Sequence, residues 1–169
     1  MSFGQVSISK SCFELIRSLL PEGKTILEFG SGFGTTQLGK HYKMYSVENQ
    51  TEWQNAYLKS TTYINCGTKM YDKKYPAPDL PQQKGWYDPE ELFDQLPEHY
   101  DLMLIDGPGG PRWGRGGFLK HLDKFNTNVP MVFDDINREP EMLLMKEVAK
   151  YVNRPYQILE SDNTIGYIL

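Results

Sequence analysis

Hydrophobic residues in this chain form short runs that alternate with longer segments of mixed hydrophobic and polar positions. The short runs have the length and composition of buried strands and cover residues 25–29, 44–48, 61–65, 100–106 and 129–133. The segments between them favour helices over about 35–41, 51–60, 118–124 and 139–152. Strands and helices that alternate in this way are typical of a parallel sheet covered on both faces. The sequence therefore predicts an α/β fold.

The two ends of the chain add further elements to this pattern. Serines at positions 7, 9 and 11 can cap a helix that carries Phe13, Ile16, Leu19 and Leu20 and stops near Pro21. At the other end, 156–160 and 164–168 are predicted strands. The Ser-Asp-Asn sequence between them suits a hairpin-like turn.

The segment from residue 67 to residue 98 interrupts the alternation. Its five prolines exclude any long regular element. Aromatic residues, among them Tyr71, Tyr75 and Trp86, give the segment apolar anchors that a disordered stretch lacks. We therefore predict one domain spanning 1–169, with an irregular but ordered insertion at about 67–98 that contains a short helix over 89–96.

Composition narrows the class of protein. At 169 residues, with 39% hydrophobic and 24% charged residues, the chain suits one compact domain. A net charge of −4 argues against a general nucleic-acid binder. No apolar run approaches the roughly 20 residues that span a bilayer, and no basic-then-apolar leader begins the chain. With Cys12 and Cys66 far apart and expected to be free thiols, these features predict a cytoplasmic protein without a membrane partner; the oligomeric state stays open.

A glycine-rich turn follows the first predicted strand. Its alternating glycines let a ligand approach the backbone closely, and the helix that begins after them offers free N–H groups to an anion. The second strand ends at Glu48, where a carboxylate can hold a ribose diol. These features predict a nucleoside-binding crevice. The candidate cofactor-binding residues are Glu28, Gly30, Ser31, Gly32, Gly34, Thr35, Thr36, Glu48 and Asn49.

The spacing of the glycines distinguishes between two kinds of nucleoside. Dinucleotide enzymes use G-x-G-x-x-G, which requires a glycine at the position of Thr35, whereas this chain has G-x-G-x-G preceded by Glu28. The arrangement resembles motif I of the class I S-adenosylmethionine-dependent methyltransferases. The resemblance implies that Glu28 faces the methionine ammonium and Glu48 the ribose hydroxyls of S-adenosylmethionine. It also implies a Rossmann-like, doubly wound, mostly parallel seven-stranded sheet with an antiparallel last strand. A structural turn without a ligand is the alternative.

Three more acids, Asp106, Asp134 and Asp135, follow the fourth and fifth predicted strands. Because the carboxyl ends of strands meet at one edge of such a sheet, these acids should lie together at the ligand crevice. One of them can deprotonate a substrate hydroxyl, and together they can ligate a hard cation such as Mg²⁺. Alternatively, they cap a helix or accept loop N–H groups. We take all three as candidate catalytic residues and Asp106 also as a cofactor contact; a divalent metal is possible but not favoured, and no metal ligand is assigned.

Two arginines occupy the glycine-rich loop at 107–117. Arg112 and Arg115 suit a phosphate or carboxylate on the substrate, which a planar guanidinium grips with two hydrogen bonds. They are therefore candidate substrate-binding residues. A solvated loop charge is the alternative for each of them.

Several motifs support a narrower resemblance. The sequences at 86–88 (W-Y-D), 100–108 (ending D-G-P) and 132–138 (V-F-D-D-I-N-R) are similar to motifs of small bacterial methyltransferase-like proteins. In that group an R-Y-P-A-L segment lies between the last two motifs, and here Arg115 is followed by Gly-Gly-Phe-Leu instead. The resemblance spans most of the chain and again implies S-adenosylmethionine as the cofactor.

Methyl transfer from a sulfonium is an in-line displacement that needs alignment and removal of the acceptor proton, but no covalent nucleophile. The chain has Asp-Gly-Pro after the fourth strand in place of the N-P-P-[YF] segment of amino methyltransferases, which favours an oxygen acceptor. We predict an S-adenosylmethionine-dependent methyltransferase that acts on a small molecule or carbohydrate. The alternatives are a cofactor-binding protein of the same fold without catalytic activity and, less favoured by the glycine spacing, a dinucleotide-dependent oxidoreductase.

Overall fold

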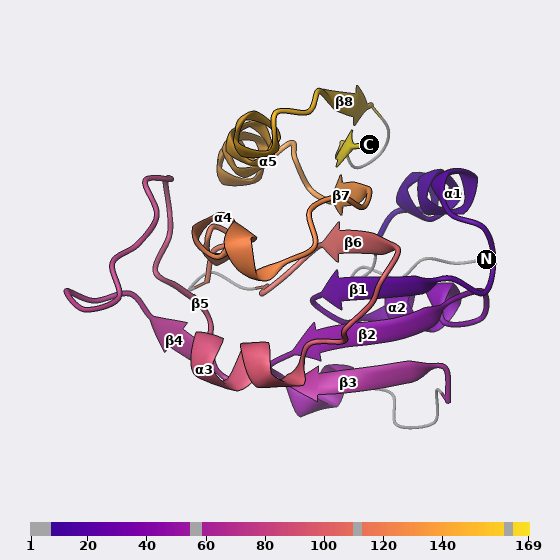
Figure 1. Cartoon of the computed structure of the whole chain (residues 1–169), viewed down its shortest axis with the longest axis horizontal. Coiled ribbons are helices and arrows are strands. Elements are labelled where there is room, and N and C mark those ends of the chain that lie inside the picture. The colour runs from indigo at the N-terminus through magenta and orange to yellow at the C-terminus, as the bar shows by residue number, and fades with distance from the viewer. Residues whose placement is uncertain (1–7, 55–58, 110–112, 161–163) are drawn as a thin grey trace.

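The computed structural model describes residues 8–54, 59–109, 113–160 and 164–169. Its centre is a seven-stranded sheet with the order β3-β2-β1-β6-β7-β9-β8 (Figure 1). Six strands run in the same direction, β9 is antiparallel to both of its neighbours, and the chain winds outward in two directions from the β1–β6 pair. The predicted fold class is confirmed. The strands are β1 (Thr25–Phe29), β2 (Lys43–Glu48), β3 (Thr61–Asn65), β6 (Leu102–Ile105), β7 (Met131–Phe133), β8 (Tyr156–Leu159) and β9 (Ile165–Ile168).

Helices cover both faces of this sheet. The α-helices are α1 (Lys10–Leu19), α2 (Phe33–Leu38), α3 (Pro89–Leu92), α4 (Gly117–Lys120) and α5 (Glu139–Val152). Short 3-10 helices are η1 (Thr51–Trp53), η2 (Phe93–Gln95) and η3 (Leu122–Lys124). The predicted helix over 139–152 is confirmed at both ends, and the predicted cap of the first helix is Ser9, whose hydroxyl accepts the Cys12 N–H at 3.1 Å.

Successive strand residues point to opposite faces, so the sheet separates two cores. Ile26 of β1 packs in a cluster with residues of α1 and α2, including Phe13 and Leu38. Its neighbour Leu27 packs in the other cluster, with α4, α5 and the insertion. Because the central strands are buried on both faces, they read as nearly continuous hydrophobic runs.

The segment predicted as an insertion, 67–98, contains a two-stranded antiparallel sheet that the sequence did not predict. Its strands are β4 (Thr68–Met70) and β5 (Gly85–Tyr87). Trp86 and Tyr87 are fully buried, and the Tyr87 hydroxyl donates to the Val47 carbonyl at 3.2 Å. Burial of two large aromatic rings offsets the cost of ordering a proline-rich segment, and it holds the insertion against the carboxyl end of β2.

The helices predicted over 51–60 and from Thr35 to His41 differ in extent from those of the structure. Of the helix predicted over 51–60, the described residues form only η1, because the Trp53 carbonyl accepts the Ser31 hydroxyl at 2.6 Å and Gln54 is extended, with its side-chain amide donating to Asn65. Residues 55–58 lie outside the described residues. The helix predicted from Thr35 to His41 begins at Phe33 and ends at Leu38. It begins earlier because the Thr35 hydroxyl accepts the Gly32 N–H at 3.0 Å, which makes the threonine a first-turn residue.

Both cysteines are buried and free. Cys12 lies in α1, and Cys66 directly follows β3. Among the described residues, no helix combines the length and apolar character needed to cross a bilayer.

Candidate functional site

A cavity of about 530 Å³ opens at the carboxyl ends of β1, β2, β6 and β7. This is the point at which the strand order reverses, where open α/β sheets bind ligands, and the volume is that of a small-molecule site. Eleven predicted site residues line it: Glu28, Gly30, Ser31, Gly32, Gly34, Glu48, Asn49, Asp106, Arg115, Asp134 and Asp135.

Backbone contact between two glycines shapes the floor of this cavity. Gly30 has a φ of 90°, which an L side chain rarely adopts. A Cβ on Gly30 would lie 2.9 Å from the Gly107 Cα, and one on Gly107 would lie 2.6 Å from the Gly30 Cα. The segments that follow β1 and β6 therefore pack main chain against main chain, which brings Glu28 and Asp106 to the same cavity.

Glu28 is a buried acid on β1 with only 1% of its surface exposed. Its Oε2 accepts the hydroxyls of Thr35 at 2.7 Å and Ser46 at 2.6 Å. Burial raises the pKa of the Glu28 carboxyl to about 7, and the two hydroxyl donors act in the opposite direction. No cation among the described residues pairs with this carboxyl, so it is suited to a ligand that carries positive charge.

Glu48 ends β2 and is held by the main chain around it. Its carboxylate accepts the Ser31 N–H at 2.9 Å and the Gln50 N–H at 2.7 Å. Burial raises the pKa of the Glu48 carboxyl, whereas these N–H donors lower it. A carboxylate offers about four acceptor positions, so both oxygens keep capacity for hydroxyl donors from the cavity.

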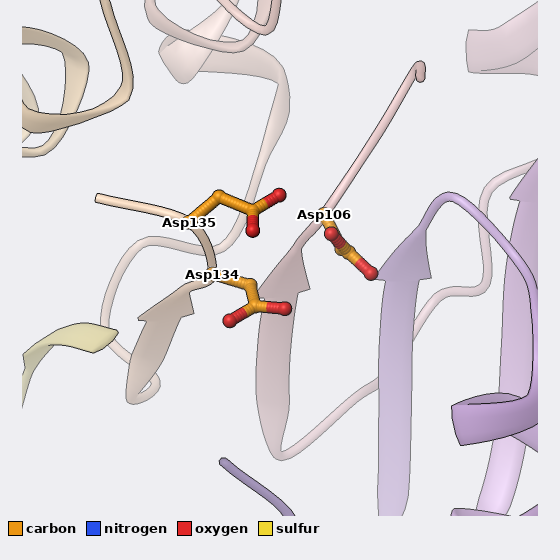
Figure 2. Close-up of side chains that lie close together, drawn as sticks. All are labelled: Asp106, Asp134 and Asp135. Atoms are coloured by element: carbon orange, nitrogen blue, oxygen red, sulfur yellow. The ribbon is translucent and has the colours of Figure 1, made fainter. Parts of the chain in front are cut away.

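Asp106, Asp134 and Asp135 form the opposite wall, with carboxylate oxygens within 4.8 Å of one another. Figure 2 shows Asp134 and Asp135, from the end of β7, directed toward Asp106 at the end of β6. Arg115 lies among them: its Nη2 is 3.0 Å from Asp106 Oδ1 and 2.9 Å from Asp135 Oδ2. Its Nη1 donates to the carbonyl oxygens of Asp134 at 2.7 Å and Ile105 at 3.4 Å. The cluster is therefore partly neutralised from within the protein.

The three acids differ in their remaining partners. Burial raises the pKa of Asp106 well above its usual range and that of Asp134 to about 6, and Arg115 opposes both shifts. Asp134 Oδ1 is buried with no hydrogen-bond partner among the described residues. Asp135 forms an ion pair with a second guanidinium, that of Arg138, at 3.1 Å, and has a left-handed φ of 59°. Strained backbone of this kind is found at functional sites.

Not every candidate from the sequence lines the cavity. Thr35 supports Glu28 from behind, and Thr36 is absent from the described lining. Arg112 lies outside the described residues. Arg115 lines the cavity but is not a free loop charge, because it is 5% exposed and paired with the acids. Its loop is held by the Gly116 N–H, which donates to Gln83 Oε1 at 2.9 Å.

The described lining also includes residues that sequence reasoning missed: Ile8, Gln50, Trp53, Gly109 and Arg138. Arg138 is the last residue of the V-F-D-D-I-N-R segment at 132–138, so the family resemblance offered a signal for it. Gln50 and Trp53 follow Glu48 closely, and Trp53 falls in the segment that was predicted to be a helix over 51–60. No local signal identified Ile8, because it reaches the cavity from the segment before α1.

Comparisons with known proteins assign the fold. No family model and no curated protein matches this chain. Among solved structures, a protein from Streptococcus mutans described as a methyltransferase, crystallised with S-adenosylhomocysteine, has a TM-score of 0.54 at 10% identity over 99% of this chain and 98% of that one. A chain of the E. cuniculi Mtq2–Trm112 complex, which methylates the eRF1 translation termination factor, has a TM-score of 0.54 at 15% identity over 99% and 95%. A methyltransferase-like protein from Silicibacter pomeroyi has a TM-score of 0.50 at 18% identity over 98% and 90%. The chain has the class I methyltransferase fold.

Proposed function

We propose that this chain binds S-adenosylmethionine and transfers its methyl group to an oxygen of a small molecule or carbohydrate. One observation carries the cofactor assignment: Glu28 and Glu48 reach the same cavity from neighbouring strands, and neither is paired with a cation among the described residues. Such a pair suits a ligand with an ammonium at one end and a ribose diol at the other.

The charge of the cavity disfavours a dinucleotide. Five carboxylates line it, from Glu28, Glu48, Asp106, Asp134 and Asp135, against the two guanidiniums of Arg115 and Arg138. A pyrophosphate placed among these acids would meet like charge. A sulfonium with an ammonium would meet opposite charge, which supports S-adenosylmethionine over NAD.

S-adenosylmethionine, when bound, supplies a methyl carbon activated by its sulfonium. An acceptor oxygen would displace sulfur from that carbon, with the electron pair of the carbon–sulfur bond left on sulfur. The chain itself aligns the two reactants and takes the acceptor proton. Asp134 is suited to the proton because its Oδ1 is unpartnered and its pKa is about 6, so it is mostly ionised at neutral pH. Asp106 is less available, since Arg115 holds its Oδ1.

Calorimetry with S-adenosylhomocysteine, S-adenosylmethionine and NAD tests the cofactor. We expect the two sulfur nucleosides to bind and NAD not to compete; binding of NAD alone would point to the oxidoreductase. Hydroxylated metabolites and nucleotide sugars would then be screened for release of S-adenosylhomocysteine. The rate of this release is compared between Asp134→Asn and a control, Asp123→Asn, which removes an exposed acid outside the cavity. Tight binding without turnover on any acceptor would favour a cofactor-binding protein without activity.

A further inference from the structure

The distances between the carboxylate oxygens of Asp106, Asp134 and Asp135 would by themselves allow a divalent cation to bind. Mg²⁺ and Ca²⁺ bind carboxylate oxygens at about 2.0–2.6 Å, so two oxygens on one ion lie at most about 5 Å apart. The oxygens of Asp106, Asp134 and Asp135 lie within 4.8 Å of one another. Spacing therefore fits a cation, and what decides the question is what already lies between the oxygens.

Arg115 lies there. One atom, Nη2, is 3.0 Å from Asp106 Oδ1 and 2.9 Å from Asp135 Oδ2. A cation shared by those two oxygens would have to lie about 2.0–2.6 Å from each, and hence directly against Nη2, which is itself positive. The guanidinium cannot move aside cheaply, because it is 5% exposed and its Nη1 donates to the Asp134 carbonyl at 2.7 Å. The wall as built does not fit a metal ion.

We propose that Arg115 is a built-in substitute for a divalent cation: its guanidinium holds Asp106 and Asp135 in place, and the site works without metal. Arg115 is thus a positioning residue rather than a substrate-binding one. The claim that methyl transfer needs no metal rests on the proposed function. The claim that Arg115 occupies the position of a cation does not.

The neighbouring charges support this assignment. Asp135 also forms an ion pair with Arg138 at 3.1 Å, but the Arg138 side chain is 58% exposed. Asp134 Oδ1 is left without a partner among the described residues. Removal of the Arg115 guanidinium would therefore leave carboxylates around a vacated centre, with one oxygen already unpartnered, which is the ligand set that a hard cation prefers.

The test is a gain of metal binding that needs neither methyl donor nor acceptor. Mn²⁺ and Ca²⁺ are titrated separately into the wild-type chain and Arg115→Ala by calorimetry. We expect Arg115→Ala to bind at least about tenfold more tightly, a change of about 1.4 kcal/mol. Adding Asp134→Asn to Arg115→Ala should remove the gain. Arg138→Ala removes a guanidinium from the same Asp135 but leaves Nη2 of Arg115 in place, so it should not produce the gain of metal binding. Arg115→Lys should not produce this gain either.

Stability gives a second readout, because Arg115→Ala leaves buried carboxylates uncompensated. We expect the melting temperature of Arg115→Ala to fall and to recover when Mn²⁺ or Ca²⁺ is added, with the same behaviour in Arg115→Gln. Binding of Mn²⁺ to the wild-type chain that disappears in Asp134→Asn would overturn the proposal. So would a result in which neither Mn²⁺ nor Ca²⁺ binds or stabilises Arg115→Ala and Arg115→Gln. Because neither measurement involves S-adenosylmethionine, failure here is distinguishable from failure of the methyltransferase assignment.

Discussion

The ionisation of Glu28 should control cofactor affinity. In the folded protein the pKa of this 1% exposed carboxyl is about 7, against a usual value of 4.5. A raised acid pKa means that the folded state holds the proton more tightly, so folding stability is lost as pH rises from 4.5 through 7. The difference of 7 − 4.5 pKa units corresponds to about 3 kcal/mol at 1.36 kcal/mol per unit. An ammonium placed against Glu28 should recover part of this energy.

The size of the effect on binding follows from that pKa. With a pKa of about 7, roughly 9% of Glu28 is ionised at pH 6 and roughly 76% at pH 7.5. If only the ionised form binds the ammonium, the affinity for S-adenosylhomocysteine should rise about eightfold between these pH values. An α-amino group keeps its proton through most of this range, so the ligand contributes little to the slope. Glu28→Gln should bind weakly with a nearly flat pH profile.

Calorimetry in two buffers of different ionisation enthalpy measures both the affinity and the proton released on binding. Asp134→Asn is the matched control: it removes another carboxyl of raised pKa, about 6, from the same cavity, yet should keep the wild-type slope near pH 7. Glu28→Gln should also be more stable than the wild-type chain at pH 8, because it removes the buried charge. A wild-type affinity that does not change between pH 6 and 7.5, or a Glu28→Gln profile with the same slope, would refute the reasoning.

Three further outcomes are expected. Glu48→Ala should weaken S-adenosylhomocysteine binding by about 1.5–3 kcal/mol through loss of a charge-assisted hydrogen bond; unchanged calorimetric affinity would remove the ribose assignment. Gly107→Ala should lower the free energy of unfolding by about 1–3 kcal/mol, because the new Cβ would lie 2.6 Å from the Gly30 Cα, and denaturant melts at wild-type stability would contradict this contact. With an acceptor in hand, kcat/KM should rise as pH passes about 6, the pKa of Asp134, and fall at least about 10²-fold in Asp134→Asn; full activity would exclude this base.

The sequence predicted those elements whose signal is local. The strands Thr25–Phe29 and Thr61–Asn65 and the helix Glu139–Val152 have the predicted bounds, because hydrophobic runs, prolines and caps act over a few residues. The helix predicted over 51–60 failed where bonds to residues distant in sequence prevailed: the Trp53 carbonyl bonds to Ser31, across 22 positions. Tertiary hydrogen bonds of this kind override helix propensity, and no periodicity in the sequence predicts them.

In the candidate site, too, residues with a local sequence signal could be predicted, whereas those placed by tertiary packing could not. Glu28 could be identified because it precedes the glycine-rich turn, and Glu48 because it ends the second predicted strand. The order of the strands brings both residues to one cavity. The burial of Arg115 could not be predicted. Its loop reads as a flexible, charged segment, and only the packing of that loop against the insertion directs the guanidinium inward, where it meets Asp106 and Asp135.

The distribution of countercharge divides the cavity into two halves with different chemistry. On the β1–β2 side, the donors that hold Glu28 and Glu48 in the described part of the chain are all neutral, namely hydroxyls and main-chain N–H groups. On the β6–β7 side, the charge of Asp106 and Asp135 is partly compensated by Arg115. A cationic ligand gains most where acids lack a partner, so S-adenosylmethionine is expected against β1 and β2. The compensated side is then left to an acceptor that arrives uncharged and gives up a proton.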